Sequence, residues 1–212
     1  MIKWLILFFL TPNFLYAHTF TGMIGFYDGL SHPVLGFDHF LAMISVGIIS
    51  AQIGGRAIWT VPLTFVLIMI IGGSIGIYIE LNEMLQTKAL DEINNSFNFS
   101  IVLNQTIEIG ILISVIVLGL IISIEKKLPI TLIMIFVGIF GFFHGSAHGL
   151  EMPWAVNPLL FALGFTTGTA TLHLFGVIIG HLFIKSYISS IILKFLGLIF
   201  SLVGLFYFIQ LF

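Results

Sequence analysis

Two short stretches of the chain concentrate side chains that can bind a metal ion. The first, H-P-V-L-G-F-D-H, runs from His32 to His39, and the second, F-H-G-S-A-H-G-L-E, runs from Phe143 to Glu151. Together they contain four of the seven histidines, in a chain of which only 8% is charged. Imidazole and carboxylate ligands suit a borderline divalent transition metal. Because the chain has no cysteine, any metal site must use nitrogen and oxygen ligands.

The spacing in the second stretch places its ligand-type groups together on a helix. His144 and His148 are four residues apart, and His148 and Glu151 are three apart. Residues at these spacings are neighbours on one helical face. We therefore expect the two histidines and the glutamate to point in a common direction, although His144 could instead orient a neighbouring ligand.

The first stretch leaves two arrangements open. Pro33 is well suited to the first position of a helix, with His32 just before it. His32 and His39 are seven residues apart, which would separate them by about 10 Å along a regular helix. Either His32 folds back outside the helix, or the two histidines belong to two successive sites.

Composition indicates that these groups lie in a membrane protein. The chain is 59% hydrophobic, with 23 phenylalanines and a mean hydropathy of +1.19, which is too apolar for a soluble domain. Its apolar runs of about 20 residues match a hydrocarbon core of about 30 Å. A transmembrane β-barrel would need alternating segments of about 10 residues, and none are present. The expected fold class is an all-α polytopic membrane protein, and the net charge of −2 argues against a nucleic-acid partner.

We expect an N-terminal signal peptide over residues 1–17 and one six-helix transmembrane domain over residues 18–212. Cleavage after Ala17 would expose His18, whose amino group and ring could chelate a metal, or which could remain an unengaged terminal histidine. An uncleaved anchor is the alternative. The acidic, asparagine-containing segment Glu80–Val102 is expected to be a loop. The six predicted spans are Pro33–Ile53, Ala57–Ile79, Leu103–Ile124, Pro129–Gly149, Pro158–Phe183 and Tyr187–Leu211.

The positive charges predict the orientation of these spans. Arg56, Lys126, Lys127 and Lys185 fall in alternate short loops, which the positive-inside rule assigns to the cytoplasm. Both the mature N-terminus and the C-terminus are then external. This topology brings ligand-type groups of three spans to one depth in the external half of the membrane. The candidate metal ligands are His32, Asp38, His39, Glu108, His144, His148 and Glu151.

The fifth predicted span adds a possible further station along a pathway. His173 lies near its middle, among threonines spaced three and four residues apart. The alternative is that the His173 ring bonds a facing backbone carbonyl and the threonines bond their own helix. His181, at the cytoplasmic end of the same span, is expected to be interfacial.

The two stretches resemble the HupE/UreJ family of membrane proteins. The family pattern H-P-x-x-G-x-D-H-x-x-A-M is present from His32 to Met43, and H-G-x-A-H-G-x-E is present from His144 to Glu151. The segment that begins Ile107-Glu108-Ile109-Gly110 is similar to the family's third span. The resemblance implies a multi-pass protein of a bacterial inner membrane, associated with nickel or cobalt uptake for hydrogenase and urease.

These observations predict a permease that captures Ni2+ or Co2+ externally and passes it inward. We expect neither enzymatic activity nor a permanently bound cofactor, and the chain lacks the G-x-x-x-x-G-K-[ST] pattern of an ATPase. The expected partners are the metal ion and the lipid bilayer, with homo-oligomer formation left open. The alternatives are a b-type cytochrome, a metal-binding accessory or sensor protein, and an intramembrane metalloprotease. The H-E-x-x-H motif of that protease is absent.

Overall fold

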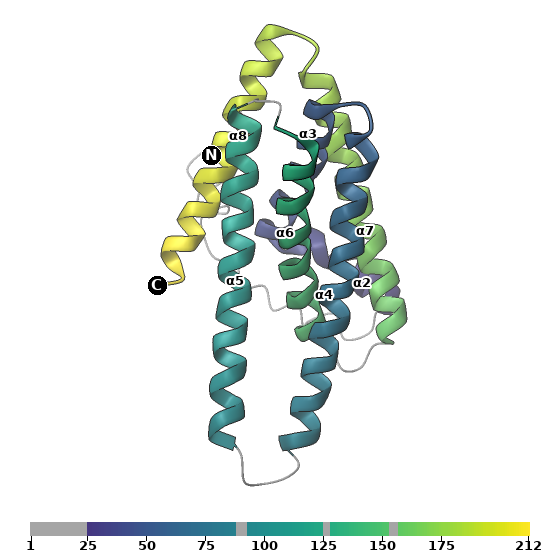
Figure 1. Ribbon diagram of the computed structural model, residues 1–212, viewed down its shortest axis with the longest axis vertical. Coiled ribbons are helices and arrows are strands. Elements are labelled where there is room, and N and C mark those ends of the chain that lie inside the picture. Colours follow the sequence, from purple (N-terminus) through teal and green to yellow (C-terminus); the bar gives the residue numbers. More distant parts are fainter. Residues whose placement is uncertain (1–24, 88–92, 125–127, 153–156) are drawn as a thin grey trace, which may run out of the picture.

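The computed structural model describes residues 25–87, 93–124, 128–152 and 157–212, and within these ranges the chain is helical, without strands. The predicted signal peptide and His18 lie outside the described residues. Figure 1 shows the helices as a bundle with α6 between α4 and α5. The helices are α2 (Gly25–Leu35), α3 (Phe37–Ile53), α4 (Ala57–Thr87), α5 (Ile93–Ile124), α6 (Ile130–Leu150), α7 (Pro158–Phe183) and α8 (Tyr187–Gln210).

The bundle has the composition and length of a polytopic membrane protein, as the sequence predicts. Five helices, α4 to α8, are each long and apolar enough to cross a bilayer. The pair α2 and α3 passes the same test jointly, but the two helices are bent by 83° relative to each other. Six candidate spans result if this bent pair counts as one.

The prediction that the first span is one helix beginning at Pro33 is wrong. Pro33 lies inside α2, which ends at Leu35. Gly36 interrupts the helical conformation, and α3 begins at Phe37. Proline removes a backbone donor from the last turn of α2, which weakens the helix just before the break. Gly36 adopts an extended conformation (φ −82°, ψ 111°), and its carbonyl accepts the first α3 hydrogen bond, from the Phe40 N–H at 2.8 Å.

The predicted Glu80–Val102 loop is also largely wrong, because both flanking helices continue through it. Helix α4 extends to Thr87 and α5 begins at Ile93, which gives the two helices 31 and 32 residues. At about 1.5 Å per residue each is roughly 46 Å long, which exceeds the hydrocarbon core. Their ends project beyond the other helices at the bottom of Figure 1. Once a helix is established, each added residue gains a hydrogen bond, so polar composition alone does not end it.

Glycines allow α4 and α6 to pack backbone against backbone. A Cβ added at Gly145 would collide with the Met69 carbonyl, and one added at Gly149 would collide with that of Gly73. Small residues at such positions let membrane helices approach closely. Helix α7 packs in a similar way along both α2 and α3. These contacts fix α2, α3, α6 and α7 around one point in the bundle, where the sequence-predicted ligands meet.

Candidate metal site

His148 is the centre of the histidine group. It lies near the end of α6, is only 4% exposed, and packs its ring 4.1 Å from that of Phe165, centroid to centroid. The His32 ring centroid lies 4.6 Å away on one side and the His39 centroid lies 4.5 Å away on another. Neither ring nitrogen of His148 has a hydrogen-bond partner among the described residues. Three helices therefore deliver imidazoles to one buried position.

The bend at Gly36 resolves the arrangement that the sequence left open. His32 belongs to α2 and His39 to α3, so the two residues do not share one regular helix. The 83° turn between these helices lets both rings contact His148. His32 and His39 thus flank one common histidine.

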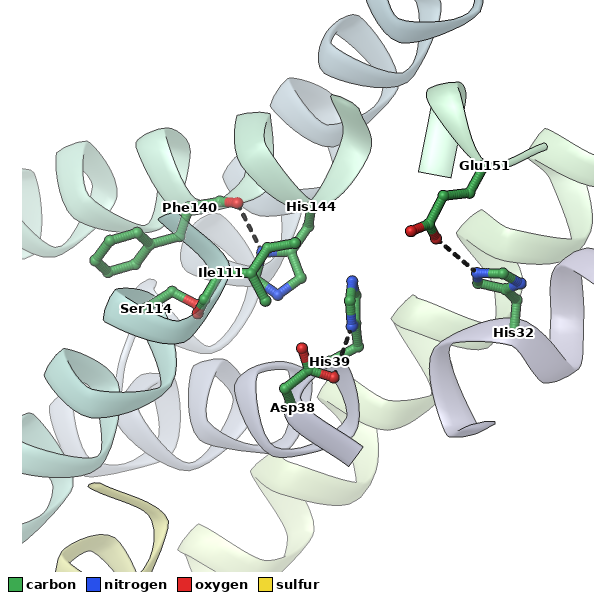
Figure 2. A network of polar contacts seen from close by, with 8 residues as sticks. All are labelled: His32, Asp38, His39, Ile111, Ser114, Phe140, His144 and Glu151. Carbon is green, nitrogen blue, oxygen red and sulfur yellow. Dashed lines mark hydrogen bonds and ion pairs between the residues drawn. The ribbon is translucent and has the colours of Figure 1, made fainter. Parts of the chain in front are cut away.

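The outer part of the group contains His32, His148 and Glu151. Their ligand atoms all lie within 4.8 Å of one another, and His32 Nε2 is 3.8 Å from Glu151 Oε2. The Glu151 side chain is 51% exposed, whereas that of His32 is 13% exposed. The three residues therefore lead from the surface into the bundle. The Glu151–His32 pair appears at the right of Figure 2. Nitrogen and oxygen ligands lie about 2.1 Å from a bound divalent ion, so a group of this spacing could hold one ion.

In the inner part of the group, His39 and His144 have the same tautomer, with the proton on Nδ1. Asp38 Oδ1 lies 3.0 Å from His39 Nδ1, and the Phe140 carbonyl oxygen lies 2.8 Å from His144 Nδ1 (Figure 2). A carbonyl or an ionised carboxylate only accepts, so each Nδ1 donates. Each Nε2 is then left buried and without a hydrogen-bond partner among the described residues. The rings of His39 and His144 are 5.0 Å apart.

This arrangement is the one found in protein metal sites. A histidine that binds a metal usually donates its other ring N–H to a carboxylate or a backbone carbonyl, which fixes the ring and its tautomer. Asp38 therefore has the geometry of a residue that orients His39. His144 Nε2 is likewise buried and has no hydrogen-bond partner among the residues that the structure describes, which is compatible with a ligand.

Glu108 adds a third carboxylate from a further helix. It lies on α5, is partly buried, and interacts electrostatically with Asp38, His39 and Glu151. The structure thus brings all seven sequence-predicted ligand residues into one region. Carboxylates of α3, of α5 and of the residue that follows α6 lie near the histidines, so the region favours a cation.

His173 is separate from this group. It lies deeper along α7, is 2% exposed, and its ring contacts Phe65, not another histidine. Within the described residues neither ring nitrogen bonds a carbonyl. This differs from the alternative in which the His173 ring bonds a facing backbone carbonyl. Thr167 and Thr171 do bond their own helix, to the carbonyls of Leu163 and Thr167. His181 is exposed at the far end of α7, as expected for an interfacial residue.

Sequence reasoning missed the aromatic residues that frame the histidines. Phe161 and Phe165 pack against His32, and Phe65 packs against His144. Nothing in the local pattern distinguishes these three among the 23 phenylalanines of the chain. Their roles follow only from which helices become neighbours.

Fold and site together define a class of protein. The chain is a multi-pass helical membrane protein in which ligand-type side chains lead from an exposed glutamate to buried histidines. Ionisable groups inside a membrane bundle are costly and usually mark a path for ions or protons.

The comparisons with known proteins agree. The family model described as HupE / UreJ protein matches residues 6–82 and 99–207, and the chain belongs to this family. Protein HupE from Rhizobium leguminosarum bv. viciae is 34% identical over 166 residues, which cover 78% of this chain and 75% of that protein. No solved structure matches the chain.

Proposed function

We propose that this protein is a nickel or cobalt uptake permease, which binds the divalent ion at the histidine–carboxylate group and passes it to the cytoplasm. The observation that carries the proposal is the set of buried ring nitrogens on His39, His144 and His148 that have no hydrogen-bond partner in the described part of the chain. A buried polar atom without a partner costs about 1–3 kcal/mol. A metal ion bound by these nitrogens would offset that cost, and membership of a family associated with nickel and cobalt uptake supports the same cargo.

The proposed direction of transport is inward, from the end of the bundle that carries Glu151. Arg56 and Lys185 lie in the α3–α4 and α7–α8 connections, which share the upper end of the bundle in Figure 1. The positive-inside rule favours the cytoplasm for that end. Glu151 and His32 would then receive the ion from the external side, in the inner membrane of a bacterium. Conduction requires binding weak enough for the ion to leave again.

The packing of the rings favours transport over haem binding. A b-type cytochrome would need two histidines on opposite faces of a macrocycle. His39, His144 and His148 instead lie in direct ring contact, with centroids 4.5 and 5.0 Å apart, so no macrocycle fits between them. The remaining alternative is an accessory or sensor protein that binds metal without moving it, and a transport measurement distinguishes this case.

The test is uptake of radioactive nickel and cobalt by cells that express the full chain. Asp38→Ala and Glu151→Ala are each expected to abolish uptake while the protein remains in the membrane at its normal level. The reason is that the first loses the group that orients His39 and the second loses an outer ligand. His181→Ala, on the exposed far end of α7, is the matched control and should transport normally.

Each outcome of this test decides between the alternatives. Near-normal uptake by either carboxylate variant would remove the proposed site. Metal binding by the purified protein, without uptake by cells that express it, would favour the accessory or sensor role. A reduced-minus-oxidised haem spectrum would favour the cytochrome.

A further inference from the structure

Phe65 stands between the histidine group and a second buried imidazole. Its ring centroid lies 5.4 Å from that of His144 and 5.1 Å from that of His173. The two histidines belong to different helices, α6 and α7, and Phe65 belongs to α4. Its side chain is fully buried, so the ring fills the space between them without reaching the surface.

His173 resembles the outer histidines in having buried ring nitrogens that could bind a metal ion. Both its ring nitrogens are buried, and neither has a hydrogen-bond partner among the described residues. A structural histidine in an apolar bundle would normally bond at least one carbonyl or hydroxyl. Within the described residues no ring contact joins His173 to a histidine of the outer cluster, whereas Phe65 is in ring contact with both His144 and His173.

Backbone contacts around Phe65 hold the neighbouring helices close together. A path between His144 and His173 would therefore open by movement of the Phe65 side chain. Gly141 packs against the Phe65 carbonyl, where an added Cβ would lie at 2.7 Å, and Gly47 packs against the carbonyl of His173. Thr169 donates a hydrogen bond to the Met69 sulfur at 3.7 Å, which links α7 to α4 one turn from each of the two rings. Rotation of the Phe65 ring is therefore a smaller change than separation of the helices.

An apolar pocket lies beside His173. It has a volume of about 250 Å3, lies between α4 and α7, and is lined by His173 together with apolar side chains such as Trp59 and Leu63, which are 72% and 55% exposed. Ile58 and Trp59 are in the first turn of α4, directly after Arg56. The pocket thus lies toward the end of the bundle opposite Glu151, and His173 is the only polar residue among the described residues that line it.

We propose that Phe65 is the gate between the outer metal site and an inner site at His173. The inference rests on the proposed transport function. In this structure the gate is closed, because the ring contacts a histidine on each side. An ion held by His144 and its neighbours reaches His173 when the Phe65 ring rotates away.

The experiment pairs two measurements on the full-length protein. Binding of nickel chloride to the purified protein in detergent, by calorimetry, reports the outer site, and initial nickel uptake by cells reports passage. His173→Gln is expected to keep the outer-site affinity and to lower uptake by about tenfold or more, the usual effect of altering a metal-site group. His181→Gln on the same helix is the control and should leave both unchanged.

Replacing Phe65 tests the gate in the opposite direction. Phe65→Ala is expected to raise the maximal uptake rate severalfold, a gain that misfolding cannot produce. If this variant does not reach the membrane, Phe65→Leu, which keeps an apolar side chain but no ring, should show the same direction. Phe200→Ala, at a buried phenylalanine on α8 with no histidine contact among the described ring pairs, should not speed uptake.

The outcomes separate this inference from the function on which it rests. If the unaltered protein neither binds nickel nor takes it up, the proposed function fails. If the unaltered protein does both, wild-type uptake by His173→Gln overturns the inner site. Uptake that is unchanged or slower in folded Phe65 variants overturns the gate.

Discussion

At the scale of single residues, the candidate site is organised by which ring nitrogen each histidine leaves free. His39 and His144 both have Nδ1 engaged, by the Asp38 carboxylate and by the Phe140 carbonyl, respectively. This fixes the tautomer and directs both Nε2 atoms toward the interior of the group. Neither ring nitrogen of His148 has a hydrogen-bond partner where the structure describes the chain, so either nitrogen is available to bind an ion together with the outer or the inner residues of the group. Rings that are fixed before the ion arrives lose little conformational freedom on binding it.

Gly36 controls the position of the Asp38–His39 pair. A Cβ at this residue would lie 3.0 Å from His39 Nδ1 and 3.4 Å from Asp38 Oδ1. Gly36→Ala should therefore push His39 away from its carboxylate and weaken nickel binding by about tenfold, the usual effect of disturbing a group that orients a ligand. Calorimetry on the purified protein measures the change. Gly138→Ala, where the nearest atoms are 3.8 Å away, is the control, and equal affinities in the two variants would contradict this role.

At the scale of helices, the break between α2 and α3 and the contact between α4 and α6 position the site. The break lets one short stretch of sequence supply two differently oriented histidines. The α4–α6 contact keeps the ligand-bearing face of α6 in place, because glycines of each helix meet backbone carbonyls of the other. Close helix packing of this kind is the main source of association between membrane helices.

Gly145 is the tightest point of the α4–α6 interface and lies between His144 and His148. An added methyl group would meet the Met69 carbonyl, so Gly145→Ala must separate the helices. We expect a loss of about 1–3 kcal/mol of stability, as for other overpacked cores. Thermal unfolding in detergent should show a lower midpoint than that of the unaltered protein. Gly138→Ala, on the same helix, should unfold normally, and an equal midpoint for both variants would argue against the close approach.

At the scale of the whole molecule, the question is whether the bent α2–α3 pair crosses the membrane. Five helices can span the bilayer individually, and a sixth crossing depends on this pair. If it crosses, Gly25 and Phe212, the two ends of the described helical bundle, lie on one side. If α2 and α3 instead enter and leave on the same side, the ends lie on opposite sides.

A reporter fused after Phe212 tests the number of crossings. Six crossings from an external N-terminus place the C-terminus outside, so an external readout is expected. A second fusion in the α7–α8 connection, at Lys185, should read as cytoplasmic and confirm that α8 itself crosses. A cytoplasmic signal from the fusion after Phe212 would show that one of the six crossings is absent.

The sequence by itself determined the class of the protein, its family and the residues to examine. Hydropathy is a local property, so the apolar runs predict α6, α7 and α8 with nearly the observed bounds, as well as the first residue of α4 and the last residue of α5. The spacings of His144, His148 and Glu151 predict neighbours on one helix, because helical geometry relates residues three and four apart. Local composition was misleading at the ends of α4 and α5, where the helices continue into polar sequence.

Only the tertiary structure decided how these residues meet. The proline and glycine of the first motif are compatible with several helix starts, and packing against α7 accompanies the sharp bend that is observed. That bend makes His148 the common neighbour of His32 and His39, which are more than a hundred residues away in sequence. The position of Phe65 between His144 and His173 likewise depends on contacts among three helices. Such contacts depend on long-range packing, which a motif does not encode locally.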